Sequence, residues 1–320
     1  RDHKDTDGSP GIIKFPRPLK TADRTFSATL SGKIATKEMR LPDKGIEIQT
    51  EGNAGQSLGF GLVPGITIRH KGRANDFVGM ISQGDIIITP KKYQEDDTSS
   101  DSLAGNVCGY GMSAGHLYIA GKVGQRHAVR SRGGVTVTEG TGKYPYQYKS
   151  GGTAINIGEN GEKVGAGITG NTQLFLYNRE KPDLHPDAMQ VQYTTKSTEL
   201  LKKEIEKYLA ATDSPRARTA LAAADGNAPL KSQFDRIVTK TFFIDKVAAV
   251  FSYDFYSLPD EKPIAEIIEH AAEEVACFLG LDDQNGEIIE YLKKGLSFFQ
   301  NNFIEKSEGV EDPYRYQQAQ

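Results

Sequence analysis

A pair of apolar residues separated by one residue recurs along the first half of the chain at a nearly constant distance. Seven such triplets are present: Ile46/Ile48, Ile66/Ile68, Ile86/Ile88, Leu117/Ile119, Val135/Val137, Ile155/Ile157 and Leu174/Leu176. Their first members are 20, 20, 31, 18, 20 and 19 residues apart. A period near twenty with one long step is typical of a solenoid that carries one loop insertion. Because strand side chains alternate between two faces, we expect both members of every triplet to point into one shared apolar interior.

Glycine decides between helical and β repeats. The chain has 34 glycines, and most of them lie between Gly45 and Gly170, interleaved with β-branched residues. Glycine suits tight corners with positive φ and disfavours helices, whereas β-branched residues favour strands. The sequence therefore predicts a mainly β fold, a right-handed parallel β-helix of about seven coils of about 20 residues over 45–177. The handedness rests on the general rule for parallel crossover connections.

The flanks of the solenoid have a different character. Residues 1–44 are rich in proline near the start, so we expect an extended N-terminal arm and an entry segment, with the arm lying on the first coil or on a neighbouring domain. The long step is explained by Lys91 to Ala104, a polar, turn-rich surface excursion that is either a tolerated insertion or a partner contact.

The C-terminal part of the chain is predicted to be α-helical. Residues 178–240 are expected to form a linker and two helices, one capped by Ser197 or Thr198, and one with Ser214 as N-cap and Pro215 at its first position. Residues 241–320 are an additional extension with two amphipathic helices within 263–304. Their apolar stripes would cap the solenoid, dock a partner or form a homo-oligomer.

Composition excludes several classes of protein. The net charge of -3 argues against a dedicated nucleic-acid-binding protein. Two distant cysteines, Cys108 and Cys277, cannot form a disulfide framework or a cysteine-based metal cluster. Without a long apolar run or a signal peptide, we expect a cytoplasmic location and no membrane contact. Because the chain begins with Arg1, we expect it to be processed, trimmed or part of a longer polypeptide.

Short motifs give little support for a catalytic or binding site. "GFGLVPG" and "GYGMSAG" lack the spacing of phosphate-binding loops, so they are interpreted as solenoid corners. His116 and His127 are eleven residues apart without a carboxylate at recognisable spacing, and we interpret them as surface residues rather than metal ligands. Cys108 is interpreted as a small core residue rather than a nucleophile.

Two further groups of polar residues can also be explained without a site. The basic residues Lys122, Arg126, Arg130 and Arg132 could meet an acidic partner surface or a phosphate, although a solvated face explains them as well. Asn75 and Asp76 are expected to cap backbone groups at a corner. The sequence therefore predicts no catalytic, cofactor-binding or metal-binding residue in this chain.

Several long segments nevertheless resemble one family. Thr21–Ala35, Gly52–Pro90, Gly105–Gly140, Ser150–Tyr177 and Leu200–Ala222 are similar, in order, to the C-terminal GXGXG domain of the glutamate synthase large subunit. The resemblance covers roughly residues 20–240 and leaves 241–320 without a counterpart.

The resemblance implies a right-handed β-helix without catalytic residues. In that family the domain braces a glutamine amidotransferase domain against a synthase domain that carries FMN and an iron–sulfur cluster. Similar domains are free-standing subunits of N-methylglutamate synthase and formylmethanofuran dehydrogenase. No nucleophilic N-terminal cysteine, FMN barrel or cluster-binding cysteine set is recognisable in this sequence.

Three hypotheses follow. The first is a non-catalytic structural or scaffolding subunit of a glutamate synthase-like complex, whose FMN and iron–sulfur cluster belong to partner domains. The second is a stand-alone binding module whose solenoid face holds a ligand. The third is an enzyme at the seam between the solenoid and the C-terminal helices, which alone predicts converging titratable groups with perturbed pKa values.

Overall fold

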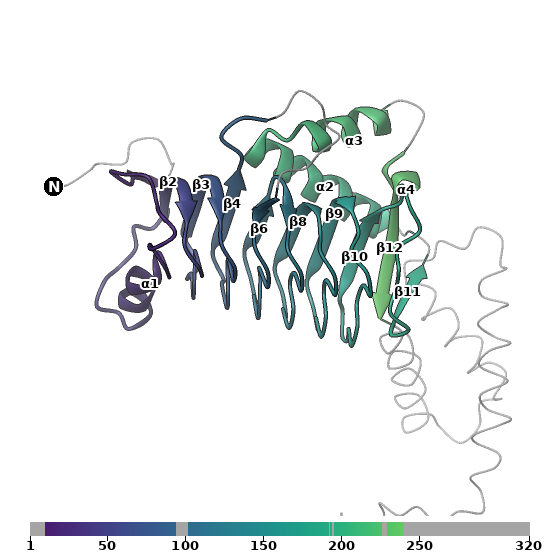
Figure 1. The fold of residues 1–320 in the computed structure, drawn as a ribbon, viewed down its shortest axis with the longest axis horizontal. Helices are drawn as coiled ribbons and strands as arrows, with labels where there is room; N and C mark the ends of the chain where they lie inside the picture. Colours follow the sequence, from purple (N-terminus) through teal and green to yellow (C-terminus); the bar gives the residue numbers. More distant parts are fainter. Residues whose placement is uncertain (1–9, 94–101, 192, 194, 226–228, 240–320) are drawn as a thin grey trace, which may run out of the picture. The chain divides into compact units, whose positions relative to one another are not determined.

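A stack of parallel strands forms the centre of the computed structural model, which describes residues 10–93, 102–191, 193, 195–225 and 229–239. The chain divides into two units, and all the described core belongs to the first, residues 1–193 with 197–242. One sheet has the order β1-β2-β3-β4-β6-β8-β9-β10-β12-β11 (Figure 1). The strands are β1 (Gly11–Lys14), β2 (Ile46–Ala54), β3 (Ile66–Ala74), β4 (Asp85–Thr89), β6 (His116–Ile119), β8 (Val135–Gly140), β9 (Thr153–Glu159), β10 (Gln173–Tyr177), β11 (Ala188–Val191) and β12 (Phe234–Thr239).

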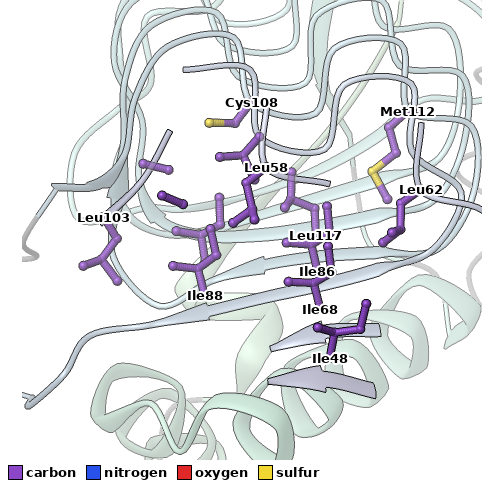
Figure 2. Close-up of a cluster of buried hydrophobic side chains, with 14 of the residues drawn as sticks. Ile48, Leu58, Leu62, Ile68, Ile86, Ile88, Leu103, Cys108, Met112 and Leu117 are labelled. Carbon is purple, nitrogen blue, oxygen red and sulfur yellow. The ribbon is translucent and has the colours of Figure 1, made fainter. Parts of the chain in front are cut away.

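The seven apolar triplets lie on seven consecutive strands of this sheet, β2 to β10, which are separated by six turns of a parallel β-solenoid. Ile46 pairs with Ile66, Ile68 pairs with Ile86, and Ile86 pairs with Leu117. Figure 2 shows Ile48, Ile68, Ile86 and Leu117 stacked in one row inside the coils. The predicted repeat and the parallel β-solenoid are therefore confirmed.

The prediction that every triplet points inward is wrong for two strands. Leu117 pairs with Thr136, which in turn pairs with Ala154, so Thr136 and Ala154 occupy the interior positions. Val137 and Ile155 point to the opposite face of the sheet, where they pack with residues of the C-terminal helices. Both faces of β8 and β9 are buried, one inside the solenoid and one under the helices. An apolar face on these strands therefore does not identify the side that points into the solenoid.

Two helices cover this outer face of the sheet (Figure 1). They are α2 (Thr195–Thr212) and α3 (Pro215–Asp225). Leu201, Ile205 and Tyr208 lie one turn apart on α2 and are fully buried against the strands. The Ser214 hydroxyl accepts a hydrogen bond from the Ala217 amide at 3.2 Å, which confirms the predicted N-cap of α3. Helix α2 begins at Thr195, two residues before Ser197, the earlier of the two caps predicted for it.

The side of each coil opposite the sheet has an unusual backbone, here called the left-handed arc. In each of six coils, three alternate residues have positive φ, and the six segments are 57–61, 77–81, 107–111, 126–130, 144–148 and 163–167. Successive arcs exchange backbone hydrogen bonds: the Gly61 amide donates to the Met80 carbonyl, and the Gly79 amide donates to the Leu58 carbonyl. Each arc is therefore held on both sides by its neighbours, as a strand is held in a sheet.

Side-chain volumes across the interior explain where glycine is needed. A Cβ atom on Gly59 would lie 2.3 Å from the Ile86 side chain, so this middle position of the arc must be glycine opposite a large residue. In the coil of residues 144–148 the equivalent residue is Tyr146, which is fully buried and packs in one cluster with the small Ala154. A large residue on one wall of the coil is thus matched by a small one on the other.

Additional strands pair with both ends of the described stack. At the N-terminal end β1 pairs with β2, which confirms that this part of the arm lies on the first coil, and the arm also contains a helix, α1 (Ala28–Ala35). At the other end β12 pairs antiparallel with β10, and a short helix, α4 (Leu230–Gln233), precedes it. Residues 1–44 are therefore not entirely extended, and 178–240 contain strands as well as helices.

The excursion at Lys91 to Ala104 returns to the fold as a strand. Its last residues form β5 (Ser102–Ala104), which pairs with β7 (Lys122–Val123) in a second sheet. The two helices predicted within 263–304 lie outside the described residues.

Candidate functional surfaces

A group of polar side chains lies inside the solenoid, where the apolar interior is interrupted. One apolar cluster extends from Leu19 to Val123 and a second begins at Ala128. Between them lie fully buried polar residues: His127, Ser131, Thr136, Thr138 and Lys149. The Lys149 Nζ donates to the Ser131 Oγ at 2.8 Å, and the Ser131 Oγ donates to the Ala128 carbonyl at 2.9 Å.

Burial changes the titration of this interior cluster. Desolvation lowers the pKa of Lys149 from 10.5 to about 7. Desolvation, with a smaller contribution from nearby Lys149, lowers the pKa of His127 to about 3. Both groups are therefore poorer proton acceptors than in water, as expected for bases without a carboxylate partner. Both side chains are fully buried, so neither titratable group reaches the surface of the solenoid.

A second polar network joins α2 to the outer face of the sheet. The Tyr208 hydroxyl donates to a Glu139 carboxylate oxygen at 2.8 Å, and the Ser214 hydroxyl donates to the same oxygen. The Tyr118 hydroxyl donates to the Glu204 carboxylate at 3.2 Å. Burial, with the adjacent carboxylate, raises the pKa of both tyrosines. Buried carboxylates that are satisfied in this way fix how a helix sits on its sheet.

His116 belongs to the same interface. Its Nδ1 lies 2.8 Å from an Asp85 carboxylate oxygen, and its Nε2 lies 3.8 Å from the Glu204 carboxylate. Its side chain is one-third exposed, in agreement with the surface interpretation. His127, by contrast, is fully buried, so its interpretation as a surface residue is wrong. Nothing in the local sequence distinguishes the two histidines; the register of the coils decides which one points inward.

The interpretations of Cys108 as a core residue and of Asn75 and Asp76 as caps are confirmed. Cys108 is fully buried, and burial raises the pKa of its thiol to about 12, so it is a core residue. The Asn75 side chain accepts a hydrogen bond from the Asp76 amide, and the Asp76 carboxylate accepts one from the Asn106 amide, each at 2.7 Å. Gly59 and Gly109, from the two glycine motifs, have positive φ in the left-handed arc.

A groove lies beside the last coils, where β9, the segment after β10 and α3 meet. Its volume is about 710 Å³, and its walls carry basic and acidic side chains, among them Lys122, Glu159, Arg179 and Arg216. Lys122 forms an ion pair with Glu159 at 3.0 Å, and the guanidinium of Arg179 lies 5.3 Å from the centre of the Tyr177 ring. The groove can therefore hold a ligand that carries both charges, next to an aromatic surface.

The four basic residues noted in the sequence lie on two different surfaces. Lys122 belongs to the groove, whereas Arg126 and Arg130 lie on the outer side of the left-handed arc and are exposed. Arg132 lies just beyond the arc and is exposed as well. The Arg130 guanidinium lies 5.9 Å from the centre of the Tyr148 ring.

Metal-binding clusters and membrane-spanning helices are both absent from the described residues. In the described ranges no three His, Cys, Asp or Glu side chains gather so that they could hold a metal ion. Over the same ranges, no helix is both long and apolar enough to cross a membrane.

Comparison with known proteins agrees with this geometry. The chain is similar to the NADH glutamate synthase of Schizosaccharomyces pombe, with 37% identity over 177 residues, 54% of this chain and 8% of that protein. It is 37% identical over 209 residues to the ferredoxin-dependent glutamate synthase of Antithamnion sp., covering 63% of this chain and 14% of that protein. For the chloroplastic ferredoxin-dependent glutamate synthase of Spinacia oleracea the identity is 32% over 225 residues, 68% of this chain and 14% of the relative.

The matched region is thus a small part of much longer relatives. The family model described as the GXGXG motif matches residues 11–239, which include every strand of the solenoid. The repeat of glycine-rich arcs and the extent of this match lead to one conclusion: the chain belongs to the GXGXG family, whose domain it shares with glutamate synthases.

Proposed function

We propose that this chain is a non-catalytic scaffolding part of a glutamate synthase-like complex. In this proposal it holds a glutamine amidotransferase domain at a fixed distance from an FMN and iron–sulfur synthase domain, in the cytoplasm. The cofactors would then belong to the partner domains rather than to this chain.

The observation that carries the proposal is the continuous hydrogen-bonded ladder on two sides of the solenoid. Strands β2 to β10 pair coil by coil on one side, and the left-handed arcs bond to each other on the opposite side. Bending such a stack would break hydrogen bonds in one wall while compressing the other. A rigid rod suits a role in which two active centres must be held in a constant arrangement.

The perturbed titratable groups give a second argument. Lys149 and His127, whose pKa values are strongly lowered by desolvation, lie in the closed interior. Glu139 and Glu204 accept hydrogen bonds from Tyr208 and Tyr118 and fasten α2 to the sheet. An enzyme at the seam between solenoid and helices would place such groups in an open cleft. The buried positions of these four residues favour a structural role over a catalytic one.

Co-expression tests the proposal. The full chain is produced with the amidotransferase and synthase polypeptides of the same organism, and the assembly is measured by native mass spectrometry. We expect a stoichiometric complex that forms glutamate from glutamine, whereas the isolated chain neither retains FMN nor hydrolyses glutamine. Stoichiometric flavin on the isolated chain, or a fully active complex that lacks it, would refute the proposal.

The groove beside β9 and α3 favours a second candidate, a binding module for a small zwitterionic ligand. A panel of free amino acids, added to the isolated chain, tests it by thermal shift. This candidate expects one amino acid to raise the melting temperature of the wild type and not of an Arg179→Ala variant.

A further inference from the structure

The outer positions of the left-handed arc carry an exceptional set of side chains in two adjacent coils. Each arc has two outer residues with positive φ, and in the coils of residues 126–130 and 144–148 these are Arg126, Arg130, Tyr144 and Tyr148. We call these four residues the arginine–tyrosine patch. At the position of Arg130 and Tyr148, three of the other four arcs have glycine: Gly61, Gly111 and Gly167.

Positive φ disfavours large side chains, because the Cβ atom crowds the following carbonyl oxygen. Glycine avoids this cost, and three of the other four coils have it at the second outer position, whereas the first outer position is non-glycine in all six coils. Burial repays the cost at Tyr146, which fills the interior, but Tyr144 and Tyr148 remain 38% and 55% exposed. The Tyr148 ring packs over Gly167 of the next coil, where an added Cβ atom would lie 2.5 Å from it. This contact leaves much of the Tyr148 side chain exposed, so packing within the chain accounts for only part of its surface.

The charges of the patch are also unbalanced. In the part of the chain that the structure describes, neither Arg126 nor Arg130 forms an ion pair with a carboxylate, and the adjacent Arg132 forms none either. The nearby lysines differ in this respect, since Lys143 pairs with Glu162 at 3.0 Å. The Arg130 guanidinium contacts the Tyr148 ring instead, which leaves its hydrogen-bond donors free for another acceptor.

We propose that the arginine–tyrosine patch is a docking surface for a carboxylate-rich surface of a partner protein. Arginine and tyrosine are enriched at the energetic centres of protein interfaces, because both offer a large, stiff contact area and specific donors. The backbone hydrogen bonds from Arg126 to Lys143 and from Arg130 to Gln147 hold the two coils of the patch in fixed register. Two guanidinium groups on such a rigid base match carboxylates bidentately.

A nucleic acid fits the patch less well than a protein does. Two coils extend over only about 10 Å, given about 4.8 Å between neighbouring strands, which is short for a groove that tracks a phosphate backbone. The chain as a whole is also acidic, with a net charge of -3. The proposal deepens the scaffolding function and rests on it only for the identity of the partner.

The test uses a variant that removes the patch without harming the fold. Arg130→Gly/Tyr148→Gly places glycine where three other coils have it. Relief of the positive-φ strain offsets the lost contacts of the Tyr148 ring with Gly167 and Arg130, so the melting temperature should stay close to that of the wild type. The matched control is Ile81→Gly, which changes an equally exposed residue (46%) with positive φ at the same arc position, two coils before Arg130. The probe is a fluorescein-labelled, glutamate-rich peptide, titrated at low ionic strength with each full-length protein.

We expect the wild type and Ile81→Gly to bind the peptide equally, and the double variant to bind at least about tenfold more weakly. Salt should weaken the wild-type binding, because the contacts are ionic and exposed. Equal binding by the double variant would overturn the proposal. Tighter wild-type binding to an oligothymidylate or to phosphatidylserine vesicles than to the peptide would also overturn it, in favour of that ligand.

Assembly distinguishes this proposal from the proposed function. If the co-expressed complex forms with the wild type and Ile81→Gly but not with the double variant, the patch is the docking surface. If it forms equally with all three proteins, the patch proposal is wrong and the scaffolding function stands. If even the wild type does not assemble, the scaffolding function fails, and the peptide titration alone decides about the patch.

Discussion

Lys149→Met tests the energetic effect of the polar interior. Lys149 is fully buried and its Nζ has one hydrogen bond, to Ser131. The pKa falls from 10.5 to about 7, and that difference corresponds to about 5 kcal/mol at about 1.4 kcal/mol per pH unit. Methionine has a similar length and no charge, so it removes this cost.

The net gain is smaller than the electrostatic cost. Loss of the hydrogen bond to Ser131 costs about 1 kcal/mol, and imperfect packing costs about 1.5 kcal/mol. At pH 6 we therefore expect Lys149→Met to be more stable than the wild type by about 2 to 3 kcal/mol. For a domain of this size the melting temperature should rise by about 5 to 10 °C.

The pH dependence identifies the cause. The folded-state pKa lies below the unfolded-state value, so between about pH 7 and 10 the unfolded wild type binds one more proton than the folded protein. Wild-type stability then rises with pH by about 1.4 kcal/mol per unit, and the advantage of the variant falls by about 3 kcal/mol between pH 7 and 9.

Urea unfolding, followed by circular dichroism at pH 6, 7, 8 and 9, measures both effects. Lys122→Met is the control, since this lysine is partly exposed and paired with Glu159. It should show no gain that fades with pH. A Lys149→Met protein that is less stable than the wild type at pH 6, or whose advantage is the same at pH 6 and 9, would refute the reasoning.

Three other predictions concern the packing of the coils. Gly72→Ala should destabilise the fold by about 3 kcal/mol or more, because the new Cβ atom would lie 2.0 Å from the Gly52 carbonyl oxygen. Gly61→Ala has open space around the new Cβ atom and should cost only about 1 kcal/mol, from the positive φ. Urea unfolding of the two variants measures the difference. Ser214→Ala should lower stability by about 1 to 3 kcal/mol in the same assay, since it removes the cap of α3 and a hydrogen bond to a buried carboxylate. In a Cys277→Ser background, Cys108 should react with a thiol reagent at pH 8 only after urea unfolding, and fast labelling of the folded protein would contradict its burial.

Much of the fold follows directly from the pattern of residues. Steps of about twenty residues between Ile46, Ile66 and Ile86 indicate a solenoid, and the glycines and β-branched residues between them favour β coils over helical repeats. Ser214 and Pro215 predict the start of α3 to the residue, since capping depends on local backbone chemistry alone. Asn75 and Asp76 are equally local, as their side chains bond to backbone within their own corner or the next coil.

The candidate sites depended on information that is not local. The triplet Val135/Val137 has the same pattern as Ile46/Ile48, yet it faces the helices, because α2 from residues far along the chain buries the second side of β8. Because Val135 and Val137 face the helices, the residue between them, Thr136, points into the solenoid. The arc of the same coil contributes the buried His127. The strand β12 enters the sheet antiparallel beside β10, a pairing between segments about sixty residues apart that no periodicity announces.

The sequence by itself therefore determined the solenoid, its period and the positions where glycine relieves the backbone, because these depend on spacing and on steric limits of single residues. Tertiary structure decided which side chains share a surface. Arg126 and Arg130 come next to Tyr144 and Tyr148 only because successive arcs bond backbone to backbone at a fixed offset. Each arc is hydrogen-bonded on both sides by its neighbours, so the side chains that meet on the surface are determined by the stacking of the coils and not by any one segment.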